Sequence, residues 1–227
     1  MILQMTRPVQ GGLRQERHFE NTSNHLANVD TPGFKKDIVS FDSAFKAQLN
    51  TDLSQGSVRV TGNDLDFALE DEGFFVIETP RGLRYTRNGN FTVNAEGFLV
   101  TQQGEPVLAG GVPLGVGDGR LYADSQGNIF VDEELVAALD VVTFANLEDL
   151  EKEGRTQFRY KGDAEDALLP ANIRMKQGAL EMANVDVVEE MSHMISIHRM
   201  YEIQQKMMMT IDEMDTKAIT ELGRSPA

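Results

Sequence analysis

Residues 184 to 214 read NVDVVEEMSHMISIHRMYEIQQKMMMTIDEM and contain neither Gly nor Pro. Their apolar side chains recur at intervals of three and four, which is typical of one face of an α-helix. Asp186 followed by Glu189 matches a capping box, and Asn184 is an alternative cap. The sequence therefore predicts a helix of about 30 residues, or about 45 Å. Its apolar stripe consists of Val187, Val188, Met191, Met194, Ile195, Tyr201 and Met208, with His198 and Gln205 in the gaps.

Methionine is concentrated in the same stretch, which holds seven of the 11 in the chain. Met can simply fill a helical core. It is also flexible enough to pack against several non-identical neighbours. Under either interpretation this is a packing helix and not a cofactor site.

The N-terminal segment has a weaker helical pattern. Thr6-Arg7-Pro8 is a plausible helix start, but apolar anchors are sparse and two glycines, Gly11 and Gly12, each cost about 1 kcal/mol relative to Ala. We expect this segment to be disordered in the free chain and to become helical against partners. The helix should end before the turn sequence Asp30-Thr31-Pro32-Gly33.

Between the two ends, apolar residues recur at every second position instead of every third or fourth, which indicates β-strands. Asn88-Gly89 is a strong hairpin signal. We expect a mainly antiparallel β domain and an α+β fold overall, with 146–154 as a short helix or loop and 163–166 as a solvated loop. The expected strands are 65–69, 74–78, 83–86, 91–93 and 98–101, with 139–144 closing the domain.

Composition excludes several classes of protein. The 227 residues include 36 acidic and 21 basic side chains, for a formal charge of −15. Most of this charge lies in residues 37–182, with 25 acidic and 12 basic side chains, whereas residues 1–36 hold three and five. So acidic a surface disfavours binding to nucleic acid or to anionic membranes. No secretory signal peptide is expected, and no stretch of 18 apolar residues that could form a transmembrane helix is found. Because Cys is absent, a disulfide or a thiolate metal site is excluded.

A search for catalytic or metal-binding patterns gives little. His193 and His198 are five residues apart on one helix and point about 140° apart, which does not suit one metal. Ser192 and Ser196 lack the positioned acid and oxyanion donors of a triad. We therefore expect no enzyme activity, no metal site and no cofactor.

Two loop sequences resemble ligand-binding loops only superficially. Residues 115–119 lack the Lys-Ser/Thr of a phosphate-binding loop and are interpreted as a β-turn. Asp64 and Asp66 lack the frame of a calcium loop, as does the 163–166 segment, and are interpreted as solvated acids.

The two ends of the chain carry sequence motifs. Residues 24–34 read NHLANVDTPGF, and residues 177–185 read QGALEMANV, followed by Val188–Met191 and Met194-Ile195. These motifs resemble the N- and C-terminal signatures of the bacterial flagellar rod and hook family. Residues 73–76 and 85–91 resemble the β domain of its distal-rod members. His25 stands where Asn is usual and Ala183 where Ser is common. The short length and residues 178–181 favour the proximal of the two distal-rod members.

The resemblance implies a structural role in which the terminal helices pack, coiled-coil-like, in the inner wall of a helical tube and the β domain faces outward. The implied partners are copies of the chain, other proximal and distal rod subunits, and the flagellar export apparatus. The implied location is the periplasmic rod of the basal body, reached without a cleavable signal peptide. No nucleic-acid binding and no membrane insertion are expected.

These signatures and the changes of period divide the chain into an N-terminal assembly helix and turn (1–35), a linker (36–60), a central β domain (61–176) and a C-terminal linker and assembly helix (177–227). The expected assembly residues of the N-terminal motif are Asn24, Leu26, Ala27, Asn28, Thr31, Pro32, Gly33 and Phe34. Those of the C-terminal helix are Asn184, Val187, Val188, Met191, Met194, Ile195, Tyr201 and Met208.

Two other functions remain as alternatives. A secreted β-rich adhesin or glycan-binding module with oligomerising helices would need exposed aromatic residues, but the chain has no Trp and four Tyr. A chaperone of axial proteins would be a compact helical dimer and leaves the β domain unexplained.

Overall fold

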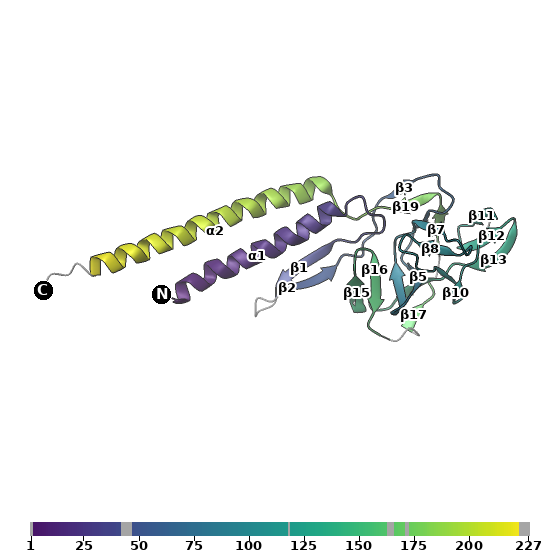
Figure 1. Cartoon of the computed structure of the whole chain (residues 1–227), viewed down its shortest axis with the longest axis horizontal. Coiled ribbons are helices and arrows are strands. Elements are labelled where there is room, and N and C mark those ends of the chain that lie inside the picture. Colours follow the sequence, from purple (N-terminus) through teal and green to yellow (C-terminus); the bar gives the residue numbers. More distant parts are fainter. Residues whose placement is uncertain (1, 42–46, 118, 163–165, 171–172, 223–227) are drawn as a thin grey trace. The chain divides into compact units, whose positions relative to one another are not determined.

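The computed structural model describes the whole chain except residues 1, 42–46, 118, 163–165, 171–172 and 223–227 (Figure 1). The described residues form two α-helices, a short 3-10 helix and 19 strands, and the strand pairings among β3 to β19 are all antiparallel. The α+β fold with a mainly antiparallel β domain is therefore confirmed. Residues 1–27, 37–50 and 186–227 form one compact unit (unit 1), and residues 28–36 and 51–185 form another (unit 2).

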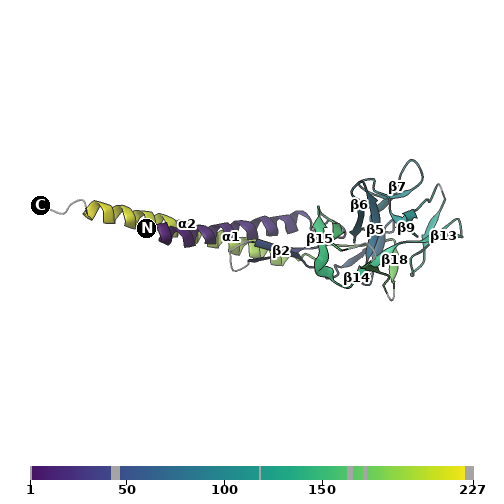
Figure 2. The same cartoon turned by 90° about the horizontal axis from the view of Figure 1, so that it is seen from below.

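Unit 1 contains the helices α1 (Ile2–Ala27) and α2 (Val187–Leu222). They lie side by side and run in opposite directions (Figures 1 and 2). Strands β1 (Asp37–Phe41) and β2 (Ala47–Thr51) form a two-stranded sheet within the range expected to be a linker. Phe41 packs edge-on against His18 of α1, with ring centroids 5.5 Å apart. Tertiary contact with α1 therefore accompanies strand formation in a segment with little local signal.

The boundaries of the helices follow local signals. Asp186 caps α2, because its Oδ1 accepts hydrogen bonds from the backbone N–H of Val188 (2.8 Å) and of Glu189 (3.1 Å). The alternative cap, Asn184, makes different contacts. Helix α1 ends at Ala27, before the predicted turn, but begins at Ile2, so the expected start at Thr6 is wrong. Pro8 is the seventh residue of this helix, and because it has no N–H, the carbonyl of Gln4 receives no helical hydrogen bond from it.

The order of α1 in the free chain stays a prediction. Leu13 and Phe19 are 57% and 42% exposed. Few apolar side chains in the described part of α1 are therefore buried. We expect amides of residues 9–27 to exchange hydrogen rapidly in the isolated protein, because a helix with so few anchors is marginal alone. Hydrogen-exchange mass spectrometry measures this, with the core strand that contains Phe75 as the slow reference. Strong protection of residues 9–27 would contradict the expectation.

Unit 2 is built around a six-stranded sheet, with five small sheets beside it. The large sheet has the order β15 (Leu150–Glu153), β16 (Gln157–Tyr160), β6 (Gly82–Thr86), β5 (Phe74–Thr79), β14 (Val141–Phe144), β17 (Ala167–Leu168). The small sheets pair β3 (Val58–Val60) with β19 (Ala179–Glu181), β4 (Phe67–Leu69) with β18 (Met175–Gln177), β7 (Phe91–Val93) with β8 (Leu99–Thr101), β9 (Leu108–Ala109) with β10 (Val112–Pro113), and β11 (Leu121–Ala123) with β12 (Asn128–Val131) and β13 (Glu134–Ala138).

Two hydrophobic clusters form the core of unit 2, and β5 contributes to both. Phe75 and Ile77 belong to the larger cluster, whereas Phe74 and Val76 belong to the smaller one with Phe158. Successive side chains of a strand point to opposite faces, so β5 is covered on both sides. This explains why its sequence, FFVIET, reads as a continuous apolar run.

The predicted strands are present, since each expected run overlaps one of β4 to β8 or β14. One interpretation was correct only in part and another was wrong. Residues 146–154 hold the expected short helix, the 3-10 helix η1 (Leu147–Asp149), but continue into strand β15, which pairs with β16. Asp66 is buried and accepts hydrogen bonds from Thr61 Oγ1 (2.6 Å) and Asn90 Nδ2 (2.9 Å). Most of the predicted loop 163–166, and Asp118 of the predicted 115–119 turn, lie outside the described residues.

Within the described residues, no helix is long and apolar enough to cross a membrane.

Candidate assembly site

The N-terminal motif and the C-terminal signature meet inside unit 2. We call residues 28–36 together with 178–184 the motif junction. The backbone N–H of Gly33 donates to the carbonyl of Glu181 (2.8 Å), and the N–H of Lys36 donates to Asn184 Oδ1 (2.8 Å). Asn184 Nδ2 also donates to the carbonyl of Asp52 (2.8 Å). The segments by which the chain enters and leaves unit 2 are thus fastened to each other.

The Thr-Pro-Gly turn depends on its glycine. Gly33 has φ +69°, and a Cβ there would lie 2.3 Å from the backbone nitrogen of Asn88. Thr31 stabilises the start of the turn, since its N–H donates to the carbonyl of Asn28 (3.0 Å) and its hydroxyl donates to Asn28 Oδ1 (3.3 Å). The turn needs both a left-handed conformation and close backbone contact, and only Gly meets both requirements.

Phe34 anchors the turn in the β domain. It is 1% exposed, and the ammonium group of Lys152 lies 4.1 Å from its ring centroid. The same ammonium group donates to the carbonyl of Lys35 (2.6 Å). A cation over an aromatic face is attracted by the ring, so this lysine stabilises both the ring and the backbone beside it.

Three charged side chains are buried at the motif junction, two of them from its own segments and one, Arg87, from outside it. Lys35 and Glu181 are fully buried, and Arg87 is 4% exposed. Lys35 Nζ donates to Glu181 Oε1 (2.6 Å), and Oε1 also accepts the N–H of Gly56 (2.9 Å). Arg87 Nη1 lies 3.5 Å from Glu181 Oε2. One carboxylate therefore faces two cations in a site that is shielded from bulk solvent.

Burial opposes both cations. It lowers the pKa of Lys35 from its ordinary value, although the charge of Glu181 and the hydrogen bond to it act in the opposite direction. Burial likewise lowers the pKa of Arg87, while Glu181 again raises it. Glu181 is therefore the group that makes two buried cations tolerable.

In unit 1, His25 joins three elements. It is 4% exposed, its Nδ1 lies 3.0 Å from Glu190 Oε1 of α2, and its Nε2 accepts the N–H of Asp37 of β1 (3.0 Å). Since Nε2 is an acceptor here, the ring proton lies on Nδ1 and faces Glu190. The departure from the usual Asn thus supplies a side chain long enough to reach both partners.

Helix α2 has one side turned towards α1. Glu190 is buried, and Met194, Ile197, Gln204 and Ile211 are half-buried. Gln204 lies against Gly11 of α1, where an added Cβ would be 2.8 Å from Gln204 Nε2. Gly11 therefore allows a close approach of a polar side chain, which its low helix propensity did not indicate; at Gly12 an added Cβ would lie at an ordinary 3.7 Å from Gln204 Oε1.

The expected assembly residues fall into two groups. Asn28, Thr31, Pro32, Gly33, Phe34 and Asn184 lie in the motif junction of unit 2, and the remainder lie in unit 1. Among the latter, Met194 and Leu26 are half-buried, whereas Asn24 and Ala27 are exposed. The others keep much of their surface in solvent: Val187 (40%), Val188 (78%), Met191 (54%), Ile195 (54%), Tyr201 (44%) and Met208 (37%).

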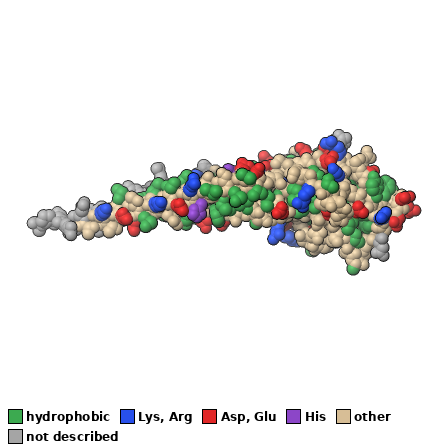
Figure 3. Space-filling model, turned by 90° about the horizontal axis from the view of Figure 1, so that it is seen from above, with side chains coloured by type: hydrophobic (Ala, Val, Ile, Leu, Met, Phe, Trp, Pro, Cys, Tyr) green, Lys and Arg blue, Asp and Glu red, His purple; other side chains and the backbone are tan. Residues whose placement is uncertain are grey.

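Further apolar side chains of α2, not included in the predicted stripe, are also exposed. Figure 3 shows apolar side chains gathered on the surface of the helical part of the chain. Such a density of apolar surface on one helix is typical of a surface that another protein covers. These additional residues are Met200, Ile203, Met207, Met209 and Met214.

Lys35, Arg87 and Glu181 were missed as functional candidates. Lys35 and Glu181 are 146 residues apart, and nothing local distinguishes them from solvated charges. The only available signal was their position: Lys35 directly follows the N-terminal motif, Glu181 lies within the C-terminal motif, and Arg87 lies within residues 85–91. In the part of the chain that the structure describes, no group of His, Asp and Glu is arranged to hold a metal ion.

Comparison with known proteins gives the family. The family model "Flagellar hook protein FlgE/F/G D1 domain" matches residues 68–143, and "Flagellar basal body rod FlgEFG protein C-terminal" matches residues 176–221. The flagellar basal-body rod protein FlgF of Caulobacter vibrioides is 34% identical, with 92% of this chain and 93% of that protein covered. FlgF of Mesorhizobium japonicum is 30% identical (92% and 92%), and FlgG of Bacillus subtilis is 29% identical (92% and 96%). With these matches along nearly its whole length, the chain belongs to the family of bacterial flagellar basal-body rod proteins of the FlgF and FlgG type.

Proposed function

We propose that this structural rod subunit polymerises through its terminal helices and transmits torque along the distal rod. The observation that carries the proposal is the exposed apolar surface of α2, which includes Val188, Met191 and Ile195. Fully burying one such side chain contributes about 1.5–3 kcal/mol, so several could offset the ordering of two helices. Members of this family are structural proteins, so the chain is not an enzyme.

We infer that α1 and α2 pack in a coiled-coil-like manner in the assembled rod. Residues of α2 that face α1 or lie next to that side follow alternate steps of four and three, as in a heptad repeat. They are Glu190, Met194, Ile197, Tyr201, Gln204, Met208 and Ile211. In this arrangement residues 1–35 and 177–227 form the assembly part, 36–60 connects it, and the β domain of 61–176 faces outward, where its negative charge is solvated.

The motif junction is proposed as the rigid link in the torque path. Gly33, Lys35, Glu181 and Asn184 fasten the entering and leaving segments by direct hydrogen bonds. Buried polar contacts hold the entering and leaving segments together within unit 2 more firmly than solvated contacts would, because each contact must be broken without water to replace it.

The proposed partners are copies of the chain and the other proximal and distal rod subunits. We propose that the flagellar export apparatus delivers the chain to the periplasmic rod. The short chain, and FlgF relatives of 30% and 34% identity, favour the FlgF role over the FlgG role. The relatives give no support to an adhesin, a glycan-binding module or a chaperone.

Replacing Ile195 with Asp should abolish incorporation into the rod. Ile195 is 54% exposed in the single chain, so the folded monomer should tolerate the charge. Burial in an assembly would leave an unpaired carboxylate in an apolar contact, which costs several kcal/mol, or roughly a hundredfold or more in affinity. Mass spectrometry of purified hook and basal-body particles from a strain that carries the variant measures the incorporated amount.

Ile195→Leu is the matched control and should incorporate normally, because it keeps the apolar volume. Circular dichroism should give the same helix content for both variants. The wild-type chain should co-purify with the particles at a fixed ratio to other rod subunits. Normal rods that contain Ile195→Asp would refute the assembly surface, and a wild-type chain found only in the free fractions would refute the incorporation of this chain into rods.

A further inference from the structure

The three-stranded sheet β11–β12–β13 carries an apolar row on its exposed face. Tyr122 pairs with Phe130, and Phe130 pairs with Leu135, so the three side chains lie side by side across the strands. Tyr122 and Leu135 are 62% and 61% exposed. The opposite face packs into the larger core cluster through Leu121 and Ile129. The exposed row is therefore surface beyond what the fold of unit 2 requires.

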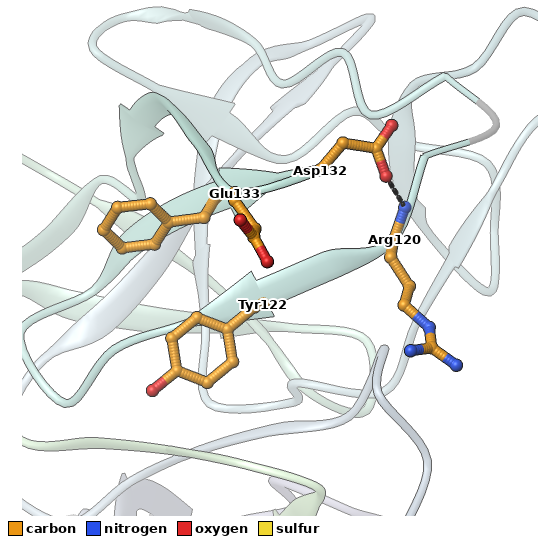
Figure 4. A pocket seen from close by; sticks show the side chains of 5 residues that line it. Arg120, Tyr122, Asp132 and Glu133 are labelled. Atoms are coloured by element: carbon orange, nitrogen blue, oxygen red, sulfur yellow. Dashed lines mark hydrogen bonds between the residues drawn. The ribbon is translucent and has the colours of Figure 1, made fainter.

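A hollow lies at one end of this row. It is lined by Arg120, Tyr122, Phe130, Asp132 and Glu133 (Figure 4). The rings of Tyr122 and Phe130 are 6.0 Å apart and inclined by 44°, so they form an open aromatic wall. Asp132 Oδ1 is occupied by the backbone N–H of Arg120 (3.0 Å). The Glu133 side chain extends over the strands towards Tyr122, as Figure 4 shows.

Glu133 occupies a position that favours glycine. Asp132 and Glu133 form the two-residue turn between β12 and β13, with φ of +50° and +71°. Turns of this kind favour Asn-Gly or Asp-Gly, because a side chain at positive φ is strained. The turn therefore keeps a carboxylate beside the aromatic wall although glycine would suit the backbone better.

The surroundings are strongly acidic. Residues 118–140 contain six acidic side chains and one basic side chain, Arg120. A second copy of the chain would bring the same negative charge to this surface and be repelled, whereas a basic group would be attracted. An aromatic face beside a carboxylate suits a guanidinium, which is planar, stacks on rings and donates forked hydrogen bonds.

We propose that this hollow is a docking site for an arginine side chain presented by a neighbouring protein other than a copy of this chain. The guanidinium stacks on Tyr122 and donates to the Glu133 carboxylate, while apolar residues beside the arginine cover Phe130 and Leu135. The site lies on the β domain and does not rest on the assembly role proposed for the terminal helices.

The test uses the full-length chain labelled with ¹⁵N and three probes: acetyl-Gly-Arg-Gly-amide and its Lys and Glu counterparts. We expect the Arg probe to shift the amide signals of residues 120–135, the Lys probe to bind at least threefold more weakly, and the Glu probe to cause no shift. Added salt should weaken the binding of the Arg probe, since the contact is partly ionic.

Two variants and one control separate binding from folding. Tyr122→Ser and Glu133→Gly should each weaken the binding of the Arg probe at least fivefold. The melting temperature of Glu133→Gly should be no lower than that of the wild type, because glycine adopts the positive φ without strain. Glu96→Gln, at an exposed turn elsewhere in unit 2, should leave binding unchanged. Equal response to the Arg and Glu probes, shifts outside the hollow, or unchanged binding by both variants would overturn the proposal. If the wild-type chain associates with itself and these variants abolish that association, the proposal is overturned, and a second copy of the chain is the occupant of the hollow.

Discussion

Replacing Glu181 with Gln should lower the free energy of unfolding by about 3–5 kcal/mol, because it leaves two buried cations without their counter-charge. Glu181 is fully buried, and its Oε1 accepts hydrogen bonds from Lys35 Nζ (2.6 Å) and the N–H of Gly56 (2.9 Å). A typical domain has about 5–15 kcal/mol of stability, so the loss is a large part of the total. Three of the four tyrosines lie in unit 2, so chemical denaturation followed by tyrosine fluorescence reports the affected part.

Glu151→Gln provides the matched control. Glu151 pairs with Arg159 at the same distance, 2.6 Å, but the two side chains are 49% and 52% exposed, so solvent replaces the lost contact and stability should change little. Adding Lys35→Met to Glu181→Gln should recover part of the loss, because one uncompensated buried charge is removed. Equal effects of Glu181→Gln and Glu151→Gln would show that the buried charge cluster does not stabilise the junction.

Replacing Gly33 with Ala should destabilise unit 2 by about 3 kcal/mol or more and displace the turn. Two costs add: the left-handed φ of +69°, and a Cβ 2.3 Å from the backbone nitrogen of Asn88, which a side-chain rotation cannot relieve. Displacement of the turn would also move Lys35 away from Glu181. Denaturation and the exchange rate of the Gly33 amide, which is bonded to the Glu181 carbonyl, measure both effects.

Gly154→Ala separates the two costs. Gly154 has φ +76°, but no atom lies within 4 Å of the position of an added Cβ. It should therefore show only the conformational cost, about 1 kcal/mol. If the two alanine variants lose the same stability, close backbone contact is not the reason why the Thr-Pro-Gly turn needs its glycine.

A fragment of residues 57–176 would span the expected central β domain, but the structure favours a longer piece for independent folding. Cutting at residue 176 interrupts β18 (Met175–Gln177) and removes β19 (Ala179–Glu181), the partner of β3. It also removes Phe34 and both members of the Lys35–Glu181 pair. Residues 28–185 retain all of these contacts, so they are the better fragment.

Elements with strong local signals could be predicted from the sequence. The cap at Asp186, the end of α1 before the Thr-Pro-Gly turn and the strands around Asn88-Gly89 depend on residues a few positions apart. The strands β3 (VRV), β15 (LEKE) and β19 (ALE) were not predicted, because short runs with so few apolar residues give little strand signal without their partner strands. Asp66 was interpreted as solvated since its three hydrogen-bond donors, Thr61, Asn63 and Asn90, gather around it only in the folded chain.

The amino-acid sequence by itself determined the α+β class, the long terminal helix, the absence of cysteine chemistry and, through its two end motifs, the resemblance to flagellar rod proteins. Helical and strand periods and turn residues act over a few positions, so they can be read without a fold. Only the tertiary structure decided that the end motifs meet in unit 2, that Lys35, Arg87 and Glu181 share one buried site, and that His25 binds Glu190. These contacts join residues 94 to 165 positions apart, and their energy depends on burial that no local pattern encodes.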